Sequence, residues 1–93
     1  MEHKDLELKH ISIVDEKKYF ISTIKMEVRH SWLNQQNNLF VYETMVFKTE
    51  DEKVVYHEPI FNQRYNCYEK AIHGHQNAID DIKKIIEEDK KNA

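Results

Sequence analysis

The chain has 93 residues with one glycine and one proline, which suits a single domain of regular helices and strands and argues against a linker-rich or disordered chain. The net charge of −3, with both signs interspersed, excludes a general attraction to nucleic acid or to an anionic membrane. A lone cysteine excludes an internal disulfide and a multi-cysteine zinc site. No apolar run or leader pattern points to a membrane or to secretion, so we expect a cytoplasmic protein.

The first two thirds of the chain carry the alternating pattern of β-strands. Residues 6–14 predict a strand, and a polar turn follows at residues 15–18. Residues 19–30 alternate in a way that leaves one face of the strand wet, whereas residues 39–47 are apolar on both faces, as in a central strand. A short strand at residues 54–57 completes an antiparallel sheet of about four strands, and residues 60–65 are expected to be a short extended connection to the helix.

A long carboxy-terminal helix is predicted over residues 66–89. Asn66 and Glu69 have the spacing of a capping box at its start, and residues 90–93 should fray. The residues that recur at the helical period are Tyr68, Ala71, Ile72, His75, Ala78, Ile79, Ile82, Ile85 and Ile86. The predicted fold is therefore a single α+β domain over residues 1–93, in which one long helix covers one face of the antiparallel sheet.

His75 lies in the apolar stripe of this helix, beside Gly74. One interpretation is a buried histidine that is hydrogen-bonded to a sheet side chain, with Gly74 allowing the helix to approach the sheet closely. The other is a histidine that contacts a bound ligand, and His30, at a strand end, could meet it in space. His73 points to a different side of the helix from His75, so the two cannot chelate one metal ion, and we expect no metal site.

Glu43 lies in the middle of the most apolar strand. A carboxylate at a buried position needs a partner, and Arg64 and His75 are the candidates. The group is either a polar pair that fixes the strand register or the polar floor of a small binding site. The candidate ligand-binding residues are His30, Glu43, Arg64, Tyr65 and His75.

One helix can cover only one face of the sheet, so the second face should expose apolar side chains. Tyr19 and Ile21, together with Trp32 in the polar loop predicted at residues 31–38, are candidates for a partner-binding surface. Scattered exposed aromatic residues would look the same in the sequence. The simplest closed arrangement through such a face is a homodimer.

The sequence shows no catalytic pattern. It lacks a glycine-rich phosphate loop, a Ser-His-Asp order and a paired-carboxylate motif. Cys67 would lie in the first helical turn, which alone is a weak signal for a reactive thiol. We therefore expect neither catalysis nor a cofactor.

Several short motifs resemble a family of small, mostly uncharacterised proteins encoded by bacteriophages and prophages. The matching segments are Ser22-Thr23-Ile24 in one strand, Tyr42-Glu43-Thr44-Met45-Val46-Phe47 in the next, Arg64-Tyr65 before the helix, and Ala71-Ile72-His73-Gly74-His75 within it. A histidine ends the first of these strands, as His30 does here. The resemblance covers residues 19–79. It implies the same order of strands and helix and a phage origin, and it supplies no agreed activity.

Together these expectations favour a non-enzymatic binding protein made by a phage or prophage and acting in the cytoplasm of the host cell. Its partner would be a host defence protein, which it inhibits, or a nucleotide-like signal of a defence system, which it sequesters. A phage structural or regulatory accessory factor is the alternative. A small hydrolase that uses His30, Glu43 and His75 is a third class. We expect no membrane partner and no nucleic-acid partner.

Overall fold

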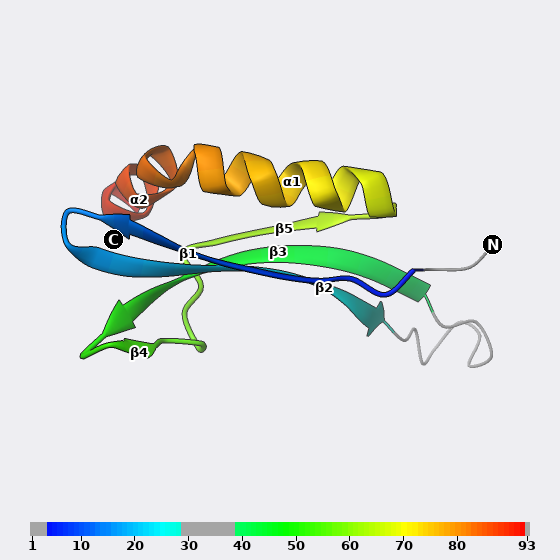
Figure 1. Ribbon diagram of the computed structural model, residues 1–93, viewed down its shortest axis with the longest axis horizontal. Helices are drawn as coiled ribbons and strands as arrows, with labels where there is room; N and C mark the ends of the chain where they lie inside the picture. Colours follow the sequence, from blue (N-terminus) through cyan, green and yellow to red (C-terminus); the bar gives the residue numbers. More distant parts are fainter. Residues whose placement is uncertain (1–3, 29–38, 93) are drawn as a thin grey trace.

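The computed structural model describes residues 4–28 and 39–92 and shows an α+β fold (Figure 1). The elements in chain order are β1 (Glu7–Val14), β2 (Lys17–Val28), β3 (Leu39–Glu50), β4 (Lys53–Val54), β5 (Phe61–Tyr65), α1 (Tyr68–Asp80) and α2 (Ile82–Lys91). The prediction of an antiparallel sheet followed by helical structure is confirmed, whereas the number of strands and the single helix need correction. None of the helices in the described part of the chain is long and apolar enough to cross a membrane.

β1, β2 and β3 form an antiparallel meander, and the far edge of β3 is shared by two shorter strands. β5 pairs with residues 42–46 of β3, and β4 pairs with residues 49–50. Two-residue turns close the β1–β2 and β3–β4 hairpins, at Asp15–Glu16 with φ of 51° and 67° and at Asp51–Glu52 with φ of 52° and 64°. Positive φ at both positions gives the turn a twist that matches the right-handed twist of the strands it joins.

The fifth strand, β5, lies where the sequence predicts only an extended connection to the helix. β3 is 12 residues long, and the hairpin with β4 pairs only its last residues. The backbone N–H and C=O groups of residues 42–46 therefore need a second partner, which residues 61–65 supply. β4 is shorter than expected, since the strand predicted over residues 54–57 is limited to Lys53–Val54.

The predicted single helix is divided at Asp81. This residue has φ −97° and ψ 17°, outside the helical range, although backbone hydrogen bonds of 2.8 and 3.0 Å continue the helical path through it. Two consecutive aspartates are weak helix formers, and the bend lets α2 follow the end of the sheet (Figure 1). The helix start also differs. Cys67 is the N-cap residue without a side-chain cap bond, so the predicted capping by Asn66 and Glu69 is wrong.

α1 and α2 lie on the same face of the sheet, and the hydrophobic core fills the space between the two layers (Figure 1). The buried residues of the core cluster are Tyr19, Ile21, Val46, Ala78, Ile82, Ile85 and Ile86. The helical stripe predicted from the sequence is therefore confirmed along most of its length. Ile72 is the exception, because its side chain is 37% exposed.

The sequence predicts that Tyr19 and Ile21 belong to a partner-binding surface, and this prediction is wrong. They are 8% and 0% exposed and lie in the core beneath the helices. Alternation along β2 separates its two faces, but it does not say which face the helix will cover. Trp32, the third residue predicted for that surface, lies outside the described residues.

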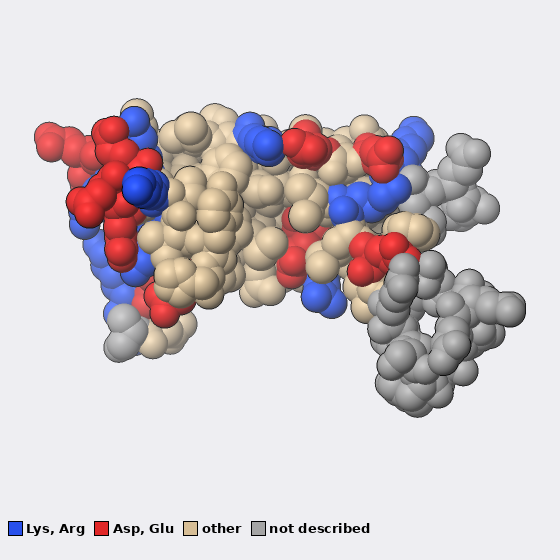
Figure 2. All heavy atoms as spheres, turned by 90° about the horizontal axis from the view of Figure 1, so that it is seen from below, with Lys and Arg blue, Asp and Glu red and all other residues tan. Residues whose placement is uncertain are grey.

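The second face of the sheet carries neither α1 nor α2, and we call it the helix-free face. The strand registers place on it Ile11 and Ile13 of β1, Phe20, Ile24 and Met26 of β2, Val41, Glu43, Met45 and Phe47 of β3, and Asn62 and Arg64 of β5. Figure 2 shows this face, with a broad uncharged area beside the charged end formed by the hairpin turns. Tyr56, two residues after β4, forms an aromatic cluster with Phe20 and Phe47, with ring centroids 5.2 to 6.5 Å apart.

Candidate interaction site

The structure separates the predicted ligand-binding residues onto the two faces of the sheet. Adjacent residues of a strand point to opposite faces, so Glu43 lies on the helix-free face while the residue after it points toward α1. Arg64 lies with Glu43, whereas His75 and Tyr65 lie on the helix side. Of the two partners predicted for Glu43, Arg64 is confirmed and His75 is excluded. His30 lies outside the described residues.

His75 connects α1 to the sheet through a chain of buried hydrogen bonds. Its Nδ1 lies 2.8 Å from the hydroxyl of Thr23, which lies 2.6 Å from the hydroxyl of Thr44 directly opposite on β3. Both threonines are 0% exposed and His75 is 8% exposed. Burial, and to a smaller extent the charge of His10, lowers the pKa of His75. A neutral imidazole can accept at Nδ1, so each threonine hydroxyl can donate to the next group in the chain.

Gly74 and Tyr65 hold the helix close to the sheet. A Cβ atom at position 74 would lie within 3.0 Å of three atoms at the end of the Tyr65 ring, namely Cζ, Oη and Cε2. Burial also raises the pKa of the Tyr65 phenol. The close approach of Gly74 to Tyr65 therefore brings α1 against β5, next to the hydrogen bond between His75 and Thr23. The interpretation of His75 as a buried histidine bonded to a sheet side chain is confirmed.

The helix-free face has a polar pair at its centre, formed by Glu43 and Arg64. Glu43 is 5% exposed, and its Oε2 accepts hydrogen bonds from Arg64 Nε at 3.4 Å and from Asn62 Nδ2 at 3.2 Å. The register aligns these groups, because Glu43 lies opposite Arg64 and Met45 lies opposite Asn62. The Arg64 side chain is 55% exposed. The pair is therefore buried on its carboxylate side and accessible on its guanidinium side.

Apolar side chains surround the Glu43 carboxylate on the same face. Ile24 lies directly opposite on β2, and Val41 and Met45 lie two residues away along β3. Met26 lies opposite Val41, and all four apolar side chains are half-buried. A charged pair in apolar surroundings interacts more strongly than the same pair in water. This arrangement can anchor a polar group of a partner within an apolar contact area.

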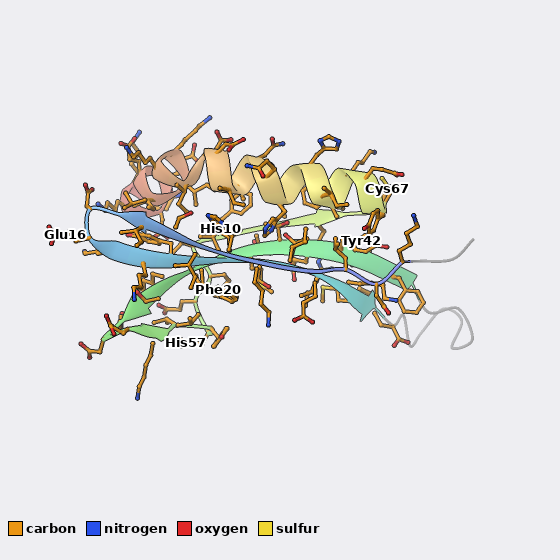
Figure 3. The ribbon with its side chains drawn as sticks, viewed as in Figure 1. His10, Glu16, Phe20, Tyr42, His57 and Cys67 are labelled. Atoms are coloured by element: carbon orange, nitrogen blue, oxygen red, sulfur yellow. The ribbon has the colours of Figure 1, made fainter. Side chains whose placement is uncertain are left out.

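Side chains on the two sides of the sheet have different surroundings. Figure 3 shows His10 on the side that faces the helices, and Phe20 and His57 on the opposite side. On the helix side the polar groups are linked to each other and lie under α1. On the helix-free face the aromatic cluster buries Phe47 to 4% exposure, while Tyr56 is still 65% exposed. The helix-free face is therefore the side on which a partner can reach large apolar side chains.

Over residues 4–28 and 39–92, no group of three or more His, Cys, Asp or Glu side chains is placed to hold a metal ion. Glu43 and His75 lie on opposite faces of the sheet and cannot act on one substrate. Cys67 is a half-buried free thiol at the start of α1.

Two of the surface hollows differ from typical small-molecule sites, one in its size and the other in its lining. The groove between β5 and the two helices holds about 170 Å³, below the roughly 300–1,000 Å³ that is usual for ligand pockets. A larger hollow of about 510 Å³ lies between the two hairpin turns, where most of its lining residues are Lys, Glu or Asp of both signs. Ligand pockets are mostly apolar with a few placed polar groups, which is not the character of this hollow.

Comparison of the chain with protein-family models, with curated proteins and with solved structures gives no match. The two faces of the sheet and the motifs in the sequence are therefore the features that bear on function.

Sequence reasoning missed the residues that make the helix-free face distinctive. Ile11 and Ile13 are 60% and 68% exposed on the edge strand β1, and Tyr56, within the strand predicted over residues 54–57, lies two residues beyond the end of β4. The available signal in the sequence was the alternation of side chains along the two strands that contain Phe20 and Phe47. It placed each aromatic ring on one face of its strand without showing that the two rings meet.

Proposed function

We propose that this chain is a small phage-encoded binding protein that counters host antiviral defence by binding and inhibiting a host defence protein through the helix-free face. The observation that carries the proposal is the composition of that face, where half-buried Ile24, Met26, Val41 and Met45 surround the buried Glu43 carboxylate. Protein interfaces typically combine such an apolar centre with a polar rim, and they are enriched in methionine, aromatic residues and arginine. The charged turn end supplies the rim (Figure 2).

A protein partner fits this face better than a small signal molecule. A nucleotide-like ligand needs a concave pocket that encloses it, with donors placed for its phosphates. The groove of about 170 Å³ beside β5 is small for such a ligand, and the polar pair at the centre of the helix-free face presents one arginine only. A broad apolar contact area with one polar anchor is instead typical of protein recognition.

An infection assay tests the proposal. The chain is expressed in a bacterium whose defence system restricts a phage, and the efficiency of plating of that phage is measured. The wild-type chain should restore plating. Met26→Glu places a charge on the helix-free face and should abolish the rescue, whereas Ile72→Glu, at a 37% exposed position on α1, should retain it.

Two outcomes would contradict the proposal. Equal rescue by both variants would exclude the helix-free face as the binding surface. Failure of the wild-type chain to rescue against a panel of defence systems, together with co-purification of a phage structural protein, would favour a structural or regulatory accessory factor that uses the same face.

A further inference from the structure

The outer edge of β1 is half protected against pairing with another strand. β1 is the end strand of the sheet, and no described element is drawn in front of it in Figure 1. In its first half, the exposed charges of Glu7 and Lys9 form an ion pair of 3.0 Å along the strand. Its second half holds no charge, and Ile11 and Ile13 there are 60% and 68% exposed. Charged side chains are the usual protection of an edge strand, so the unprotected half is a place where a further strand can pair.

The backbone of this half-strand is oriented for such pairing. The Leu6 carbonyl accepts a hydrogen bond from the Lys25 N–H at 3.1 Å, so Leu6 and every second residue after it direct their backbone groups toward β2. Ile11 and Ile13 lie at the alternate positions of the strand, so their backbone N–H and C=O groups point away from β2, toward the outer edge. The same two residues therefore offer both the apolar side chains and the free backbone groups of the edge.

We propose that two copies of this chain pair antiparallel through the second half of β1, with Ser12 of one copy opposite Ser12 of the other. In this register Ile11 of each copy lies opposite Ile13 of the other, and the two residues exchange backbone hydrogen bonds. Lys9 lies beside the acidic turn residue Asp15 of the second copy. The pairing joins the two sheets into one and places the two helix-free faces side by side.

Charge and side-chain matching select this register from the alternatives. If Ile11 were at the centre of the pairing, Glu7 would face Asp15 with the same charge, and Lys9 would face an isoleucine. If His10 were at the centre, both Glu7 and Lys9 would face isoleucines. Only the register centred on Ser12 opposes isoleucine with isoleucine and lysine with aspartate, and like charges opposite each other destabilise a strand pair. This pairing does not depend on what the helix-free face binds.

Cysteine trapping tests the register. In a Cys67→Ser background, Ser12→Cys should form an intermolecular disulfide under mild oxidation, because residues opposite each other in a non-hydrogen-bonded pair have Cα atoms about 4.5 Å apart, within disulfide range. In the same background, His10→Cys should remain unlinked, because the two positions would be four residues apart along the strands, or roughly 13 Å. Efficient linking of His10→Cys, or none of Ser12→Cys, would overturn the proposed register.

Sedimentation equilibrium tests the pairing itself. The wild-type chain should be a dimer at high concentration, and Ile11→Lys should be a monomer that keeps the wild-type circular-dichroism spectrum, since the Ile11 side chain is 60% exposed. Ile72→Lys also removes an exposed isoleucine, but from α1, and should leave the dimer intact. A strictly monomeric wild-type chain, or loss of the dimer in Ile72→Lys, would overturn the proposal.

Discussion

Replacing Gly74 by alanine should destabilise the fold, although alanine is the better helix former. In an ordinary helix the change would gain about 1 kcal/mol. Here the new Cβ would lie within 3.0 Å of the Cζ, Oη and Cε2 atoms of Tyr65, so the ring or the helix must move. Overpacking of this kind costs about 1–3 kcal/mol. With three atoms overlapping, we take the upper part of that range and expect a net loss on the order of 1–2 kcal/mol.

Urea unfolding and thermal melts followed by circular dichroism measure this loss. For a domain of this size the melting temperature should fall by roughly 4–16 °C. The control is the same change in a Tyr65→Val background, where the overlapping ring atoms are absent. There Gly74→Ala should stabilise the protein by about 1 kcal/mol, the helix-propensity gain alone. A destabilisation of the same size in both backgrounds, or a stabilisation in both, would refute the contact between Gly74 and Tyr65.

Three further predictions follow from the two faces of the sheet. Burial lowers the pKa of His75 in the folded state, so the contribution of His75 to stability should be complete above pH about 6.5 and be lost as the pH falls toward the folded pKa. Urea unfolding midpoints measured across this pH range should fall for the wild type and should not show this fall for His75→Gln. Arg64→Ala should cost about 1–3 kcal/mol and Glu43→Gln less, because only the former leaves a buried carboxylate without its cation; equal losses in urea unfolding would contradict this. Ile82→Asp should prevent folding, whereas Ile72→Asp should cost under about 1 kcal/mol, as circular dichroism melts would show.

Periodicity predicted the parts of the fold in which one pattern repeats over many residues. The stripe that ends in Ile82, Ile85 and Ile86 is buried as expected, and the β2 and β3 strands lie where alternation placed them. β5 could not be recognised, because its sequence Phe61–Tyr65 has polar residues at its three middle positions. It is a strand because β3 has free backbone groups there, which is a tertiary requirement that its own residues do not express.

The sequence identified most of the individual polar residues of the candidate site but not how they are arranged in space. Buried polar residues in apolar stretches need partners, and this reasoning identified the pair of Glu43 with Arg64 and the buried His75 of α1. Sequence alone could not show that these groups lie on opposite faces, because that depends on which face of β2 the helices cover. Because the helices cover the face of β2 that carries Tyr19 and Ile21, these two residues lie in the core and not on the expected partner surface.

The central claim is that the helix-free face is the surface that binds a host protein. The most direct test is quantitative affinity capture from infected cells with an active defence system, comparing the wild-type chain with Met26→Glu and Ile72→Glu by mass spectrometry. A defence protein should be enriched by the wild type and by Ile72→Glu and be lost with Met26→Glu. Recovery of the same protein by Met26→Glu at the wild-type level, or its loss with Ile72→Glu, would contradict the account.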